Sequence, residues 1–192
     1  MLGAVEESFN GKSPKIRGLI KLYLLSCPLL WQTKKYKNKV LDLGCGWGFY
    51  FKINPLAYGI DANPKALDYL KKKNFKVVSG DITEKLPFAD NYFKCVVCHD
   101  VLEHFYPGDI KKIFNNVYNI LEPNGIFLIL VPNKKGFLRM LSAGHKTFID
   151  SKEVIYFSQG KFDVKKHFFY PLSRPIEKYF YHNKQIFYLT KK

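Results

Sequence analysis

The chain has 192 residues, of which 47% are hydrophobic and 17% aromatic, so it can bury one core and one domain is expected. No apolar run reaches the roughly 18–20 residues that span a bilayer. Glu6 and Glu7 stand where a secretory signal would be basic and then apolar. A cytoplasmic protein without stable membrane insertion is therefore expected.

The net charge of +15 is confined to the two flanks of the chain. Residues 1–40 hold eight Lys or Arg against two Asp or Glu, and residues 133–192 hold thirteen against four, whereas residues 41–132 hold ten of each. Such flanks can attract a phosphorylated metabolite, a nucleic acid or a membrane surface. A lysine-rich surface without a specific partner explains the same numbers, since only three of these basic residues are arginines.

The first predicted element is an apolar helix over residues 15–31, with basic residues at one end. It can lie on a membrane surface or serve as a lid over a site. We favour the lid because a glycine-rich motif begins so soon afterwards.

From residue 39 onward, short apolar runs alternate with amphipathic stretches. Asn63 and Asp109 are the expected N-caps of two helices. This alternation predicts a parallel, doubly wound sheet that binds ligands at the carboxyl ends of its strands. The predicted strands are 39–43, 56–61, 75–81, 92–100 and 126–133, and the predicted helices are 63–74 and 108–121.

The last third of the sequence is less regular. Residues 151–159 are predicted as a short helix, and 171–181 as a further helical stretch. Strands are expected within 160–170 and at 184–190.

Cys95 and Cys98 have the CxxC spacing of zinc and redox sites. No second cysteine or histidine pair completes a ligand set at a usable spacing, so we predict no metal. The segment is interpreted as a strand in which both cysteines behave as small hydrophobic residues.

The segment GCGWG places Gly44, Gly46 and Gly48 directly after the first strand. A dinucleotide fingerprint would be GxGxxG, but its third glycine position is Phe49, and the acidic Asp42 lies inside the strand. No Gly-Lys-Ser/Thr sequence follows, so a phosphate loop is excluded. The pattern predicts a ligand without a pyrophosphate but with a cationic or hydrogen-bonding part.

Two further acids end the next strands. Asp61 can accept hydrogen bonds from both hydroxyls of a ribose. Asp81 can accept from an exocyclic adenine amine, with Ile82 against the ring. An adenosine joined to a charged chain without phosphates fits S-adenosylmethionine.

Four segments in this order and spacing resemble the successive motifs of class I S-adenosylmethionine-dependent methyltransferases, most closely the type 11 group that includes quinone-biosynthesis enzymes. They are VLDLGCGWG, YGID, GDITEKLPFADNYFKCVVCHDVLEHF and LEPNGIFLILVPN. The resemblance covers residues 39–132. It implies a Rossmann-like α/β fold, a seven-stranded, mostly parallel sheet with one antiparallel strand.

By the same resemblance, residues 1–192 form a single methyltransferase domain. Residues 1–35 are its N-terminal cap or lid helix and 39–132 its cofactor-binding core, and 133–192 supply the acceptor side and the closing strands. Because only about ten residues separate Gly48 from the second strand, the first helix is short and the adenosine pocket is expected to be open.

The resemblance also assigns the cofactor contacts. The methionine end would lie against Asp42, Gly44, Cys45 and Gly46. Asp61 and the neighbouring Ala62 would hold the ribose, Asp81 and Ile82 the adenine, and the backbone at Cys98 and His99 would close beneath the sulfonium. Two alternatives stay open: Asp61 as the cap of the following helix, and Asp81 as a turn residue.

Candidate catalytic residues cluster in CHDVLEHF. His104 is the first choice as base or acceptor contact, with His99 and Asp100 beside it. Asp100 and Glu103 also have the spacing of a helix capping box, and His104 can be an ordinary surface residue. His145 belongs to a stretch that reaches the acceptor side in the family.

The segment CHDVLEH lacks the Asn/Asp-Pro-Pro-aromatic sequence of enzymes that methylate base amines or glutamine amides. Cys98 also lacks the proline setting of a nucleophilic cysteine. The predicted function is therefore methyl transfer from S-adenosylmethionine, giving S-adenosylhomocysteine, to oxygen or carbon of a small, anionic or lipid-linked acceptor. An RNA methyltransferase using the basic flanks and a non-catalytic binding protein are the alternatives, and oligomeric state is not predicted.

Overall fold

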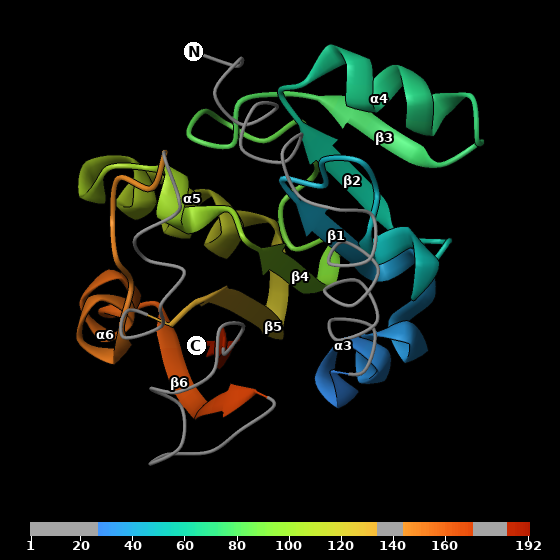
Figure 1. The fold of residues 1–192 in the computed structure, drawn as a ribbon. Helices are drawn as coiled ribbons and strands as arrows, with labels where there is room; N and C mark the ends of the chain where they lie inside the picture. Colours follow the sequence, from blue (N-terminus) through green and yellow to red (C-terminus); the bar gives the residue numbers. More distant parts are fainter. Residues whose placement is uncertain (1–26, 134–143, 171–183) are drawn as a thin grey trace.

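A single seven-stranded sheet forms the centre of the computed structural model, which describes residues 27–133, 144–170 and 184–192. The strand order is β3-β2-β1-β4-β5-β7-β6. Figure 1 labels β1 to β6. The strands are β1 (Val40–Leu43), β2 (Tyr58–Asp61), β3 (Lys76–Ser79), β4 (Phe93–His99), β5 (Leu121–Pro132), β6 (Phe162–Tyr170) and β7 (Lys184–Lys191).

Strands β1 to β5 pair in parallel, whereas β7 runs antiparallel to both of its neighbours, β5 and β6. The expected Rossmann-like sheet with one antiparallel strand is thereby confirmed. Because β7 runs in the opposite direction, its first residue, Lys184, pairs with Pro132 at the carboxyl end of β5. A side chain from the tail of the chain therefore reaches the edge at which the parallel strands end.

Both faces of the sheet are covered, as the long apolar runs of the central strands require. Along β4, Val96 and Cys98 pack on the core beneath α5 (Pro107–Ile120) and α6 (Ser151–Ser158). Cys95 and Val97 face the opposite core, which includes residues of α3 (Pro28–Gln32) and α4 (Pro64–Lys71). The two cysteines of the CxxC segment thus point to opposite faces and both are fully buried, as their expected role as hydrophobic residues requires.

The helix caps agree with the sequence in one case and differ in another. Asn63 caps α4, because its Oδ1 accepts from the N–H groups of Lys65 and Ala66. The prediction for Asp109 was wrong, since α5 begins at Pro107 with Tyr106 at the N-cap position. The fixed φ of proline suits the first helical position, so the helix starts before the aspartate.

In the described part of the chain, short 3-10 helices precede β1 and follow β1 and β4: η1 (Thr33–Lys39), η2 (Tyr50–Lys52) and η3 (Leu102–His104). η2 occupies the place of the first helix, which is short as expected. It joins the N-terminal segment to the core through a short hydrogen bond between the hydroxyls of Thr33 and Tyr50.

Only the end of the predicted N-terminal helix, α3, falls within the described residues, so its role as a lid stays a prediction. The helix predicted at 171–181 also lies outside them. In the described part of the chain, no helix combines the length and apolar character needed to cross a bilayer.

Candidate functional site

The glycine loop after β1 lies against the carboxyl end of β2. The N–H groups of Gly44 and Cys45 both donate to the Ile60 carbonyl, at 2.9 and 3.0 Å. Gly44 has φ +73°, and a Cβ there would stand 2.6 Å from a methyl group of Val101. At Gly46, with φ +46°, a Cβ would meet nothing within 4 Å. Gly44 is therefore required for packing, whereas Gly46 faces open space.

Asp61 ties this loop to the next strand. Its Oδ2 accepts from the Gly46 N–H at 2.7 Å and its Oδ1 from the Asn63 N–H at 2.8 Å. Since Asn63 provides the helix cap, the alternative of Asp61 as cap is wrong. A carboxylate has about four acceptor sites, so Asp61 can still accept from ribose hydroxyls. The adjacent Ala62 is exposed on the same edge.

Asp42 is a buried carboxyl group at the same edge, and the described residues donate no hydrogen bond to it. Burial, reinforced by the nearby charge of Asp61, raises the pKa of Asp42 to about 8. Without a ligand, the group is therefore mostly protonated at neutral pH. An ammonium group of a bound ligand would favour its ionised form.

Cys45 and Cys98 line the edge with their backbone, since both side chains are buried in the core. A Cβ at Gly59 would lie only 2.8 Å from the Cys45 sulfur, which shows how closely the thiol packs beneath β2. Burial raises the pKa of both thiols, so neither is a reactive thiolate.

The expected adenine contacts lie in the turn after β3. Asp81 Oδ1 accepts from both the N–H and the hydroxyl of Thr83, at 2.8 and 2.7 Å, so the alternative turn role is present. Ile82 is buried. Asn116 of α5 donates to the carbonyls of Ile82 and Glu84, at 3.1 and 2.6 Å, and so fixes this turn against the helix.

A second cluster of polar groups follows β4. Asp100 has φ +54°, and its Oδ2 forms a short ion pair with Lys184 and lies 3.3 Å from His99 Nε2. Burial alone would raise the pKa of Asp100, but the charge of Lys184 outweighs it and lowers that pKa. Burial lowers the pKa of His99 to about 4, so its imidazole is neutral at pH 7.

Glu103 and His104 belong to η3. No capping box forms between Asp100 and Glu103: Val101 is the N-cap residue, and its turn has no side-chain cap. Asp100 is paired instead with Lys184. His104 Nδ1 lies 3.4 Å from the Gly144 carbonyl oxygen, and its ring is 5.0 Å from that of His145.

The structure thus brings the predicted cofactor residues to one edge and the predicted catalytic residues to the end of the adjacent strand, β4. Sequence reasoning missed Lys184 and Asn116, which come from elements far along the chain. It also left out Trp47 of the glycine loop, which is 55% exposed and lies edge-on to Tyr69 with ring centroids 5.7 Å apart.

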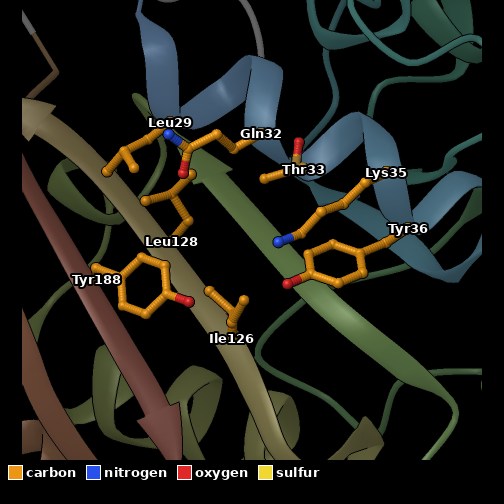
Figure 2. A pocket seen from close by; sticks show the side chains of 8 residues that line it. All are labelled: Leu29, Gln32, Thr33, Lys35, Tyr36, Ile126, Leu128 and Tyr188. Atoms are coloured by element: carbon orange, nitrogen blue, oxygen red, sulfur yellow. The ribbon is translucent and has the colours of Figure 1, made fainter.

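A small pocket lies elsewhere, between the N-terminal segment and the sheet (Figure 2). Thr33 and Tyr36 line it from η1, Leu128 from β5 and Tyr188 from β7. Its volume is about 20 Å³, room for about one water molecule and far below the roughly 300 Å³ of a small-molecule site. The pocket is therefore a packing gap rather than a ligand site.

The fold is that of the class I S-adenosylmethionine-dependent methyltransferases. A crystal structure of such a methyltransferase from Archaeoglobus fulgidus matches with a TM-score of 0.68 and 20% identity, covering 98% of each chain. A Pyrococcus horikoshii protein of known structure matches with a TM-score of 0.69 and 21% identity, covering 94% of this chain and 93% of that one.

A sequence match to a family model supports the same assignment. Residues 41–129 match the family model described as a methyltransferase domain, and they contain both the glycine loop and the strand-end acids. Residues 41–129 are therefore similar to a methyltransferase domain, and S-adenosylmethionine is the cofactor that the fold class implies.

The curated relatives match over a smaller part of the chain. An uncharacterised Methanocaldococcus jannaschii protein is 33% identical over 114 residues, which is 55% of this chain and 48% of the relative. The malonyl-[acyl-carrier protein] O-methyltransferase of Legionella pneumophila is 27% identical over 55% of this chain and 40% of that protein. The probable tRNA methyltransferase 9B of Mus musculus is 27% identical over 52% of this chain and 23% of that protein. The matches span about half or less of these relatives.

The residues at the sheet edge fit this cofactor. Open space beside Gly46 leaves room at the loop, and the Asp42 carboxyl has no hydrogen-bond donor among the described residues. The cofactor carries an ammonium group for such a carboxylate and ribose hydroxyls for Asp61. The edge therefore offers a counterpart to both polar parts of the ligand.

Proposed function

We propose that this chain transfers the methyl group of S-adenosylmethionine to an oxygen or carbon atom of a small acceptor that is anionic or lipid-linked. The observation that carries the proposal is the position of the polar cluster at Asp100. It follows β4, the strand hydrogen-bonded to β1, so it stands beside the glycine loop rather than on another face.

The chain's own residues divide into two groups. Asp42 and Asp61 bind the polar ends of the cofactor, and Asn116 holds the turn that faces the adenine. The cofactor supplies a methyl group that is already activated by its sulfonium. What remains for the protein is to hold the acceptor in line and, where the acceptor carries a proton, to accept it.

His99 and Asp100 are suited to the acceptor side. The neutral imidazole of His99 can accept a proton above about pH 4. Asp100 is held ionised by Lys184, so it can orient a hydroxyl or a cationic group of the acceptor. His104 is half-buried at the same end of β4, and we retain it as an acceptor contact.

The acceptor class rests on three supports. The sequence after β4 lacks the Asn/Asp-Pro-Pro-aromatic pattern of amine methylation. Lysine excess on both flanks favours an anionic acceptor or carrier. A relative that matches over half of this chain is a methyltransferase of malonyl-[acyl-carrier protein].

RNA is the second candidate acceptor. The basic flanks favour binding to a polyanion, and another relative is a probable tRNA methyltransferase. A non-catalytic binding protein is the third possibility, against which stand the intact acids at the ends of three strands.

The first test is calorimetric titration of the purified chain with S-adenosylhomocysteine, with NADH as competitor. We expect micromolar binding that NADH does not displace. Asp61→Ala should weaken it by roughly 10- to 100-fold, because each hydrogen bond to an ionised group contributes about 1.5–3 kcal/mol.

Asp68→Ala is the matched control, because Asp68 is an exposed aspartate on the neighbouring helix α4. It should leave the affinity unchanged. Asp61→Asn serves as a second variant, since Asp61 also supports the Gly46 and Asn63 N–H groups. Failure of the unmodified chain to bind S-adenosylhomocysteine would remove the enzyme proposal and favour a non-catalytic role.

A further inference from the structure

Two histidines and a glutamate from separate segments meet beside the acceptor side of the site. Glu103 and His104 lie on η3, and His145 lies more than forty residues later. One potential coordinating atom from each lies within 4.8 Å of the other two. Two imidazoles and one carboxylate form a donor set typical of zinc and other divalent transition metals.

Hydrogen bonds hold the two segments together at this point. The Glu103 carbonyl accepts from the N–H groups of Lys146 and Thr147, at 2.8 and 3.2 Å. The Thr147 hydroxyl donates to the Phe105 carbonyl at 2.7 Å. These bonds hold together the backbone segments that carry His104 and His145. The closeness of the cluster is therefore set by the backbone.

Glu103 is the observation that points to a ligand. It is 3% exposed, and neither of its carboxylate oxygens has a hydrogen-bond partner. The nearby Lys184 is paired with Asp100, and Glu103 forms no ion pair of its own in the described part of the chain. A buried carboxyl group without a hydrogen bond is costly to ionise, and a bound cation would offset that cost.

One tautomer of His104 is compatible with coordination. Its Nδ1 faces the Gly144 carbonyl oxygen at 3.4 Å. Protonation at Nδ1 then leaves the Nε2 lone pair available to a metal. Metal-binding histidines commonly use this arrangement, in which the second ring nitrogen donates to a backbone carbonyl.

We propose that Glu103, His104 and His145 bind one divalent transition metal ion, with the ligand chemistry of Zn²⁺. Both histidines are only half-buried, so the ion keeps at least one position open to solvent. The CxxC segment takes no part in this site, so the proposal departs from the expectation of no metal, which rested on that segment.

The open position gives the ion a role toward the acceptor, and this role rests on the proposed methyl-transfer function. A hydroxyl of the acceptor coordinated there would have a lowered pKa and would release its proton to solvent more readily. The site would then select acceptors that carry a hydroxyl or carboxylate able to reach the metal. Binding of the ion itself does not depend on methyl transfer.

The test is metal binding to the untagged full chain after treatment with a chelator, measured by titration with Zn²⁺ and by the visible absorption of Co²⁺. We expect one ion per chain with micromolar or tighter affinity, and Co²⁺ bands typical of four or five ligands including imidazole. His104→Ala and His145→Ala should each lower the affinity at least about tenfold.

His167→Gln is the matched control, because it removes an imidazole from β6, where Nε2 lies 3.2 Å from Gln185 Oε1. It should bind the metal as the unmodified chain does. Titration with S-adenosylhomocysteine is run on every variant to show that the cofactor edge is folded. The same titration separates the two proposals, because a loss of cofactor binding contradicts the methyl-transfer proposal and leaves the metal-site proposal unaffected. Absence of saturable metal binding, or equal binding by His145→Ala, would overturn the site.

Discussion

The buried carboxyl group of Asp42 destabilises the folded chain when it is ionised, but it can bind a cationic part of the ligand. Its carboxyl group is buried at the end of β1 without a hydrogen-bond donor among the described residues, and its pKa is raised to about 8. The folded state holds this proton more tightly than the unfolded state. The protonated carboxyl group therefore makes its full contribution to the free energy of unfolding below pH 4. It is lost as the pH rises through 8.

Asp42→Asn should therefore stabilise the ligand-free chain at alkaline pH. The expected gain over the unmodified chain is about 1–3 kcal/mol at pH 8.5 and close to zero at pH 4, because the amide does not ionise. Urea unfolding across this pH range measures it. The same variant should bind S-adenosylhomocysteine more weakly, since an amide does not neutralise an ammonium group. A stability difference that is independent of pH would show that Asp42 is not the titrating group.

At the scale of elements, the antiparallel strand β7 connects the tail of the chain to the acceptor side. Lys184 is its first residue, and the antiparallel direction places its ammonium beside Asp100 at the end of β4. The Lys184 side chain is 12% exposed and that of Asp100 38%, so the ion pair is only partly screened by solvent. The pair therefore links two elements that are 84 residues apart in sequence.

Lys184→Met should destabilise the chain by about 1–2 kcal/mol at pH 7, less than a fully buried pair because Asp100 is partly exposed. Asp100 has a lowered pKa in the folded state, so its stabilising effect is present above pH 4 and is lost as the pH falls through that lowered value. The difference between the two proteins should accordingly shrink below pH 4 in urea unfolding experiments.

Lys165→Met is the matched control, because Lys165 forms an exposed pair with Asp163 at 3.2 Å. It should change stability by less than about 0.5 kcal/mol. Asp100→Asn combined with Lys184→Met should recover part of the loss, since no unpaired carboxylate remains. Equal effects of the two lysine substitutions would remove the special role of Lys184.

The sequence predicted those elements of the fold that local residue patterns determine. The alternation of apolar runs predicted where the described strands of the sheet lie, and the Asn63-Pro64 pair predicted the start of α4. The expected start of β5 at residue 126 was wrong, because the strand already begins at Leu121. The prediction of a helix start at Asp109 was wrong. Pro107 and Asp109 both favour the first turn of a helix, and the helix begins at the proline. The capping-box alternative for Asp100 was wrong for a different reason: its partner, Lys184, comes from the other end of the chain, and a spacing of three residues cannot reveal a contact made in three dimensions.

The same limit applies to the candidate site. Strand-end acids such as Asp61 could be placed from the sequence because parallel strands end at a common edge. Asn116 could not, because an asparagine on an amphipathic helix carries no signal that its side chain holds a distant turn. The resemblance placed His104 and His145 on the acceptor side, but not their ring contact, which depends on backbone bonds between η3 and residues 146–147.

At the scale of the whole molecule, the charge distribution separates the two acceptor classes. The central 41–132 segment is neutral and the flanks hold the entire excess of +15. If RNA is the acceptor, binding should weaken by roughly 100-fold between 50 and 200 mM salt, as expected for about five phosphate contacts. Fluorescence anisotropy with a labelled tRNA measures this dependence.

Two lysine clusters of equal charge allow the test to be matched. Substitution of Lys34, Lys35 and Lys37 by alanine removes three charges from the N-terminal flank, whereas the same change at Lys71, Lys72 and Lys73 removes three from the end of α4 and the residues after it. A specific RNA site on the flank predicts that only the first triple variant loses affinity and salt dependence. Equal losses in both variants would indicate attraction by net charge alone, and the small, anionic acceptor would then be favoured over RNA.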